Sequence, residues 1–147
     1  MLPGIAIPAG LMAGGLVLAP GTLAQPISVL GTADLVLTTT WQDVPGLTIN
    51  LPAGTWIVIG EFATEMASGT DYMHAKMVNA TDAVDLCNCI LNLTAAYRRS
   101  GRLAFLVTLG GQKTIKMQAA QNGGAHTVVY QHGAGAQLSR VSAVKVI

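Results

Sequence analysis

The sequence predicts an all-β protein: a jelly-roll-like β-sandwich of about eight strands, preceded by an extended N-terminal arm. Short segments in which apolar and polar residues alternate recur from about residue 33, and this period of two is typical of strands with one buried face. Gly, Pro, Asn and Asp separate the segments, as turns require. Eight or nine short strands and no convincing helix over about 115 residues fit a two-sheet jelly roll.

The clearest pattern lies in residues 41–65, WQDVPGLTINLPAGTWIVIGEFATE. Apolar and polar residues alternate over 47–51, which predicts a strand. Residues 52–54 (PAG) have the composition of a turn, and 55–59 are a β-branched and aromatic run that suits a buried strand. An earlier turn is expected at 43–46 (DVPG), after a first strand.

The remaining strands follow from the same signals. A polar loop is expected at 67–71 and a turn rich in Asn, Thr and Asp at 79–85. The segment 86–93 alternates less cleanly than the others, and 113–119 has the pattern of a sheet with one exposed face. Outside the central stretch, the expected strands are 34–40, 72–78, 86–93, 102–109, 113–119, 126–131 and 138–147.

The most continuous apolar strands supply the expected core. A residue in such a run is expected to lie between the two sheets. The residues predicted to be mostly buried are Trp56, Ile57, Ile59, Phe105, Val107 and Val129.

Charge is scarce. Hydrophobic residues make up 51% of the chain and charged residues 10%, whereas a soluble domain typically carries about 25% charged residues. Much of the surface is therefore expected to be covered by other copies, by a larger assembly or by a membrane. The net charge of +1, with Arg98, Arg99 and Arg102 as the one basic cluster, gives no argument for nucleic acid. We interpret that cluster as a surface contact for an acidic neighbour, with phosphate or glycan contact as the alternative.

Residues 1–32 contain no charged residue and many Pro and Gly breakers. These breakers disfavour a membrane-spanning helix, and the missing positive n-region disfavours a signal peptide, although a cleaved leader stays an alternative. We predict an extended arm (1–32) that binds a partner surface, ahead of a β-sandwich domain (33–147). The expected partner-binding side chains are Leu2, Ile5, Ile7, Leu11, Leu16 and Leu18.

No catalytic, metal or cofactor motif is present, and G-x-S-x-G is absent. Three histidines lie on separate segments, and three acids lack the calcium-loop pattern, so we interpret them as surface and turn residues. Cys87 and Cys89 share one face of a strand, a spacing that disfavours a bond between them; an intermolecular disulfide is the alternative to two small buried thiols. The histidines and acids considered are His74, His126, His132, Asp71, Asp82 and Asp85.

Several motifs resemble small β modules of bacteriophage structural proteins. Residues 41–46 (WQDVPG) and 51–56 (LPAGTW) are similar to the stretch that opens those modules. Residues 114–119 (TIKMQA) and the C-terminal 138–147 (LSRVSAVKVI) resemble two of their later strands, with Lys145 where Arg is usual. The resemblance covers about residues 33–147 and leaves the arm unexplained.

The resemblance implies a tumour necrosis factor (TNF)-like jelly roll that assembles as a trimer. It implies a non-enzymatic virion structural protein without cofactors, most simply a capsid decoration or cement protein on the head surface, with the arm on the major capsid protein or another virion protein. Subunit contacts are expected near 113–119 and 138–147. The alternative is a tail-fibre or receptor-binding tip that presents the loops 67–71 and 132–137 to a host surface glycan. A secreted cytokine-like or lectin-like protein is a third possibility if the N-terminus is a removed leader. No contact with membrane or nucleic acid is expected.

Overall fold

The computed structural model describes residues 11–12 and 15–16 through their backbone, and residues 26–95, 97–123, 127–130 and 139–146 in full. The strands are β1 (Leu11–Met12), β2 (Gly15–Leu16), β3 (Ile27–Leu30), β4 (Leu35–Val36), β5 (Gln42–Leu51), β6 (Gly54–Met66), β7 (Thr70–Asn79), β8 (Val84–Thr94), β9 (Arg99–Leu109), β10 (Lys113–Gln121), β11 (Thr127–Val129) and β12 (Arg140–Val146).

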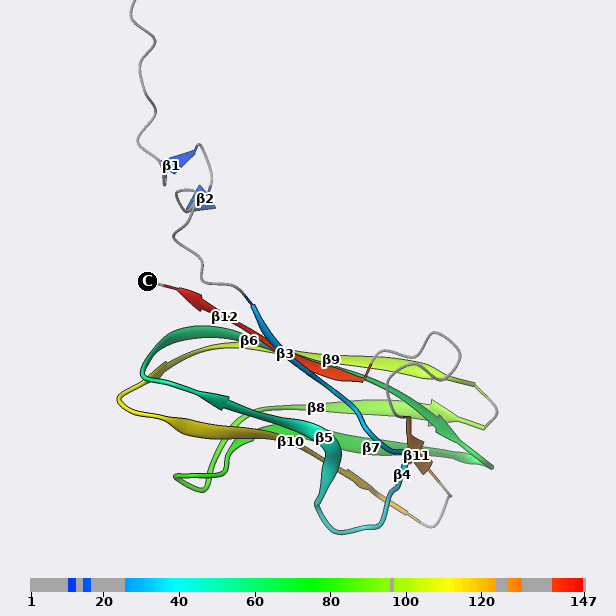
Figure 1. Cartoon of the computed structure of the whole chain (residues 1–147). Helices are drawn as coiled ribbons and strands as arrows, with labels where there is room; N and C mark the ends of the chain where they lie inside the picture. Colours follow the sequence, from blue (N-terminus) through cyan, green and yellow to red (C-terminus); the bar gives the residue numbers. More distant parts are fainter. Residues whose placement is uncertain are drawn as a thin grey trace, which may run out of the picture.

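Two antiparallel sheets pack face to face, and no helix occurs in the described part of the chain (Figure 1). One sheet has four strands in the order β5-β10-β7-β8. The other contains β3-β12-β6-β11-β4, with β9 paired to β6. β1 and β2 pair with each other and belong to neither sheet of the sandwich. The predicted all-β sandwich is confirmed.

β6 is the central strand of the larger sheet. It pairs with β9 from Gly54 to Thr64 and with β12 from Thr55 to Glu61. Its last residues, Thr64 to Met66, pair with β11. A strand with neighbours along both edges is fully hydrogen-bonded, which suits its β-branched sequence.

The predicted turn at 52–54 carries the chain from one sheet to the other. β5 ends at Leu51 in the four-stranded sheet, and β6 starts at Gly54 in the larger sheet. Gly54 has φ 138°, a conformation that favours glycine. The turn also satisfies the buried indole of Trp56, whose Nε1 donates to the carbonyl oxygen of Pro52 at 3.0 Å.

The turn predicted at 43–46 is wrong, because β5 runs through these residues. The register with β10 shifts here: Lys116 pairs with Thr48, while Gln118 already pairs with Asp43. The extra residues form a bulge at which Gly46 takes φ 80°. A Cβ at Gly46 would lie 2.3 Å from the carbonyl oxygen of Leu30, so only glycine fits beside this neighbouring backbone segment.

Other strand boundaries differ from expectation in both directions. Of the strand predicted at 34–40, Leu35–Val36 form a strand, β4, which pairs with β11, and Leu37 N also donates to the carbonyl oxygen of Thr127. The less regular segment 86–93 is part of β8, which pairs with β7 from end to end except at a bulge that leaves Leu86 without a partner in β7. The turn expected at 79–85 spans 80–83.

β3 was not expected, because its residues lie in the predicted arm. Ile27–Leu30 pair with β12, and Val29 packs against the core. β3 also lies beside β5, where Thr32 N donates to the carbonyl oxygen of Pro45 at 3.1 Å. The last part of the predicted arm is therefore a paired strand of the larger sheet.

The core lies between the two sheets and is rich in methionine. Met adapts its shape to irregular gaps, and aromatic residues make up only 5% of the chain. The largest fully buried side chains are Phe62, Leu47, Ile49, Leu51, Met66, Met73, Met77, Leu93, Ile115, Met117, Val58 and Val129.

The core prediction was right for Trp56 and Val129, which are 2% and 0% exposed. Phe105 and Val107 are partly buried and pack against the core. It was wrong for Ile57, which is 40% exposed, and Ile59 is only half-buried. Successive strand residues point to opposite faces, so the inward position of Trp56 and Val58 turns Ile57 and Ile59 outward.

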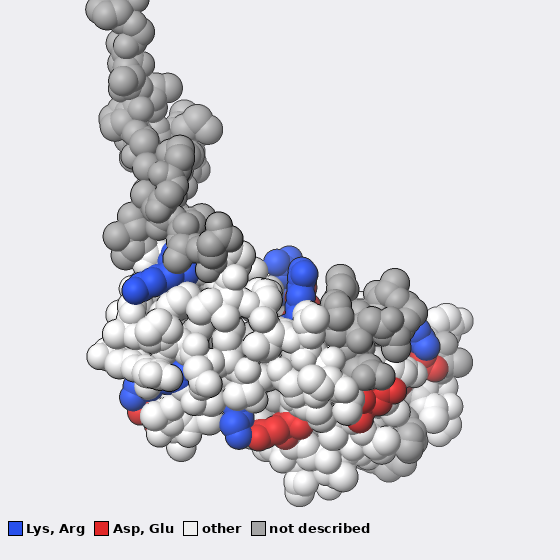
Figure 2. All heavy atoms as spheres, in the orientation of Figure 1, with Lys and Arg blue, Asp and Glu red and all other residues white. Residues whose placement is uncertain are grey.

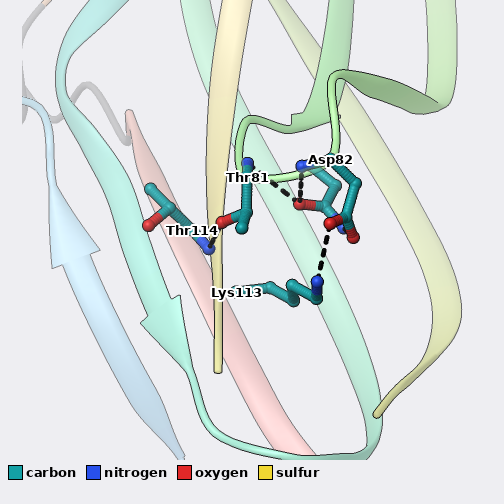
Figure 3. Close-up of polar contacts among 5 residues, drawn as sticks. Thr81, Asp82, Lys113 and Thr114 are labelled. Carbon is teal, nitrogen blue, oxygen red and sulfur yellow. Dashed lines mark hydrogen bonds and ion pairs between the residues drawn. The ribbon is translucent and has the colours of Figure 1, made fainter. Parts of the chain in front are cut away.

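The β7–β8 hairpin turn is held by side chains (Figure 3). Asn79 Oδ1 accepts hydrogen bonds from the backbone N–H groups of Thr81 and Asp82, at 3.1 and 3.2 Å. Lys113 Nζ lies 2.6 Å from Asp82 Oδ1, and Thr114 N donates to Thr81 Oγ1 at 2.9 Å. These bonds tie the turn to the start of β10. Asp82 is thus a turn residue, as predicted.

Candidate interaction surfaces

The outer face of the larger sheet presents an apolar surface, which we call the β6–β9–β12 face. Val144, Ile57 and Leu106 stand side by side on β12, β6 and β9. Ile57 and Leu106 are 40% and 66% exposed. The face consists of Thr55, Ile57, Ile59, Ala104, Leu106, Thr108, Ser142, Val144 and Val146.

The polar groups of this face pair with one another. Thr55 and Thr108 share a hydrogen bond between their hydroxyls at 3.0 Å. Ser142 does the same with Ser28 of β3, at 2.8 Å. Satisfied hydroxyls cost less to remove from water, so the face is suited to being covered by another surface.

Charged side chains border the β6–β9–β12 face at one end. Glu61 accepts from Arg140 at 2.5 Å and lies 3.8 Å from Arg102 Nε. Charges at the rim and apolar residues at the centre are the usual anatomy of a protein–protein interface.

The outer face of the four-stranded sheet is polar by contrast. Asp43 accepts from Lys116 Nζ at 2.6 Å and from Gln118 Nε2 at 2.7 Å. These bonds, that to Lys116 first, lower the pKa of the Asp43 carboxyl. Lys76 pairs with Asp85 at 2.9 Å. Figure 2 shows such paired charges at a few places, with wide uncharged areas between them on the face displayed.

An aromatic cluster lies at one end of this polar sheet. Trp41 precedes β5, and Tyr72 and His74 project from β7. Trp41 and Tyr72 are 43% and 39% exposed. The ring of His74 contacts both edge-on, with centroid distances of 6.2 Å to Trp41 and 5.5 Å to Tyr72. The pairing of strands in the sheet brings residue 41 next to residues 72 and 74. No pattern in the sequence predicts this contact.

The residues of the predicted arginine cluster have different surroundings, and Arg102 is the one that lies near Glu61 at the rim of the β6–β9–β12 face. Arg98 Nε donates to Glu65 Oε2 at 2.8 Å, and its guanidinium lies 4.8 Å from the Tyr130 ring centroid. The bond to Glu65 raises the pKa of Arg98. Arg99 is exposed at the start of β9. Their role at an interface stays a prediction.

The predicted arm contacts are only partly within the described residues. Leu2, Ile5, Ile7 and Leu18 lie outside them. Leu11 and Leu16 pair through their backbones in β1 and β2. His126 and His132 also lie outside, as does the loop 132–137. No group of three or more metal-binding side chains occurs among the residues that the structure describes.

Both cysteines are free and half-buried on β8. They pack against the core, and burial raises the pKa of both thiols. No helix long and apolar enough to cross a membrane occurs in the part of the chain that is described.

Two facing antiparallel sheets, with strands that pass from one to the other, define a TNF-like jelly-roll β-sandwich. The fold is similar to Eiger TNF from S. frugiperda, with TM-score 0.57 and 13% identity over 83% of this chain and 92% of that chain. It is also similar to murine APRIL, with TM-score 0.53 and 11% identity over 82% and 97%.

A weaker similarity, with TM-score 0.48 and 14% identity, relates 97% of this chain to 40% of the VP2 protein of infectious bursal disease virus. No protein-family model matches the sequence. No curated protein is significantly similar to it. At these identities the comparisons establish the fold alone.

Proposed function

We propose that this protein is a non-enzymatic structural protein of a virion, whose copies associate through the β6–β9–β12 face. The observation that carries the association is the row of Val144, Ile57 and Leu106 across three adjacent strands, and the virion role follows from the resemblance to phage structural modules. An apolar side chain that becomes fully buried contributes roughly 1.5–3 kcal/mol. Association of copies would remove this row from water. A chain with only 10% charged residues has few other ways to cover its apolar surface.

The trimer is the form of association that the resemblance to phage structural modules implies. A cyclic trimer brings the same face of three copies together around one axis. We propose that the N-terminal segment up to residue 25 then attaches the trimer to the capsid surface, as a decoration or cement protein. The second candidate is a tail-fibre tip. The exposed aromatic cluster favours this candidate, because it could serve as a ligand-binding surface.

Oligomeric state tests the association. Light scattering of the full chain at micromolar concentration should give three times the monomer mass. Leu106→Asp places an unpaired charge in the proposed interface and should give a monomer. Ile90→Asp is the matched control, because Ile90 is 60% exposed on the other sheet, and it should stay trimeric. A monomeric wild-type protein would refute the proposal.

The position in the particle requires a separate experiment. Electron microscopy of purified particles, combined with the copy number of the chain, would distinguish the two placements. A copy number near that of the major capsid protein, with density on the head, supports decoration. A few copies at the tail support a receptor-binding tip, and absence from the particle contradicts both.

A further inference from the structure

A surface hollow of about 250 Å³ opens beside the aromatic cluster. It lies where the segment before β5, the strand β7 and the end of β10 meet. This end of the four-stranded sheet is remote in the fold from the proposed self-association face, which belongs to the other sheet. The residues that line the hollow are Thr39, Trp41, His74, Ala120, Gln121 and Asn122.

The aromatic rings at the hollow are held by neighbours on the protein side. Lys76 Nζ lies 4.4 Å from the centroid of the Trp41 ring, so the ammonium covers one face of the indole. His74 contacts Trp41 edge-on, with 74° between the ring planes. Trp41 is nevertheless 43% exposed. A ring fixed in this way loses little freedom when a ligand packs on it.

Amide groups lie beside the rings. Gln121 Oε1 is buried and accepts no hydrogen bond within the described residues. A buried carbonyl oxygen without a donor is costly, so this amide gains a hydrogen bond if it turns toward a ligand hydroxyl in the hollow that Gln121 lines. Among the described residues Asn122 Nδ2 donates to Asp71 Oδ1, at 3.3 Å, and its second N–H can donate to a ligand. The backbone N–H groups of Gln121 and Asn122 donate to Thr38 and Tyr72, which fixes both residues.

We propose that this hollow binds a single ring of a saccharide. A pyranose has an apolar C–H face that packs on an indole, and hydroxyl groups at its rim that both donate and accept. The exposed Trp41, the buried acceptor of Gln121 and the amide of Asn122 match these features. This proposal goes beyond self-association and does not depend on it.

The electrostatics of the hollow argue against charged ligands. No Asp, Glu, Lys or Arg is among its lining residues. Lys76, which lies against the Trp41 ring, is engaged by Asp85 at 2.9 Å. A phosphate would find no lysine or arginine in the lining. Asp71, the carboxylate bonded to the lining residue Asn122, already accepts from Asn122 Nδ2 and from the backbone N–H of Tyr72. An uncharged, hydroxylated ring is the class that fits.

The two tryptophans make a direct test possible, because Trp41 is 43% exposed and Trp56 is 2% exposed. The probes are the methyl glycosides of glucose, galactose, mannose and N-acetylglucosamine, titrated into ¹⁵N-labelled full-length protein. At least one should shift the indole N–H resonance of Trp41 saturably and leave that of Trp56 unchanged. Trp41→Phe assigns the two resonances.

Variants then separate the contacts. Trp41→Ala should abolish binding of the glycoside that the wild type binds. Because this variant lacks the Trp41 indole, binding is monitored through the backbone amide resonances of Ala120 and Asn122. Gln121→Leu should weaken binding about tenfold or more, because the ligand hydroxyl loses its acceptor. Tyr97→Ala is the matched control: Tyr97 is 65% exposed but does not line the hollow, so affinity should be unchanged.

Three results would overturn the proposal. They are a Trp41 resonance that no glycoside shifts, a Trp41→Ala variant that binds like the wild type, and equal shifts of both indoles. The Leu106→Asp variant should bind as tightly as the wild type. Its loss of trimers would therefore leave the saccharide result intact, so the two proposals fail separately.

Discussion

The outer faces of the two sheets differ although both sheets share one core. The central strand of the larger sheet, β6, turns Ile57 and Ile59 outward. A central strand of the smaller sheet, β10, turns Lys116 and Gln118 outward, and both bind Asp43 of β5. The side chains of one outer face therefore supply polar partners for one another, whereas the other face has apolar side chains that remain exposed among the described residues.

This difference explains why the apolar run at 55–59 contains two residues outside the core, Ile57 and Ile59. A strand covered on both faces reads as a continuous apolar segment, whereas a strand with one wet face alternates. β10 alternates and has one wet face. β6 is continuous, yet among the described residues only its inner face is fully buried. The sequence of β6 is thus consistent with a second cover, supplied by another copy.

The largest expected effect concerns the core that the two faces share. Phe62 is 1% exposed, and its ring packs where a Cβ of Gly101 would lie 2.1 Å from Cζ. Phe62→Ala should lower the free energy of unfolding by roughly 3–5 kcal/mol. Ile57→Ala on the outer face of the same strand should cost under about 1 kcal/mol in the unassociated chain.

Both variants are to be measured by chemical denaturation in the Leu106→Asp background, which separates folding from association. Equal losses for the two would contradict the inward and outward assignment along β6.

The second effect concerns the edge of the apolar sheet. A chain starting at Pro26 keeps β3, whereas a chain starting at Gly31 lacks it and exposes the site of Val29 on the core. The longer chain should match the full-length protein in unfolding midpoint, and the shorter chain should lose about 2 kcal/mol.

The truncated chain that starts at Pro26 also tests whether the arm attaches the protein to the particle. The chain starting at Pro26 should form trimers but fail to bind empty particles, if residues up to 25 make the attachment. Full binding by that chain would assign attachment to the sandwich itself.

A smaller effect is expected on the polar face. Asp43→Asn removes the charge that Lys116 and Gln118 bind and should cost about 0.2–1 kcal/mol, the range of exposed ion pairs. Because folding lowers the pKa of Asp43, its contribution is present above the unfolded pKa, about 3.9. It is lost as pH falls through the folded value.

The difference in unfolding free energy between wild type and Asp43→Asn should accordingly shrink below about pH 4. A difference that stayed constant down to pH 2 would show that the ion pair contributes nothing. Thr48→Ala, on the same face of β5, is the control and should show no such pH dependence.

The smallest effect is kinetic and concerns the inner side of the polar sheet. Burial raises the pKa of the thiols of Cys87 and Cys89, so less thiolate is present than in the unfolded chain. Modification by a disulfide reagent at pH 8 should be slower in the native protein than in denaturant. Equal rates would mean that β8 opens readily or that its thiols are exposed.

Local patterns were sufficient to predict much of the fold. The alternation at 113–119, the PAG turn at 52–54 and the Asn and Asp residues at 79–85 each have a local physical cause. Alternation with a period of two indicates a strand with one face exposed to water. Gly54 adopts the φ of 138° that the turn requires, and Asn79 accepts hydrogen bonds from the backbone of its own turn. Such features depend on near neighbours in the chain, so the sequence alone determined the all-β class and most of the strands.

Distant pairing decided the rest. Residues 27–30 look like the apolar segment before them, and only β12, more than a hundred residues later, makes them a strand. The VPG bulge needs its shifted register with β10. The saccharide hollow needs Trp41, His74 and Gln121, which three separate segments bring together. Tertiary structure also decided which side of β6 is inner, because an apolar run does not say which residues face the other sheet and which face a neighbouring copy.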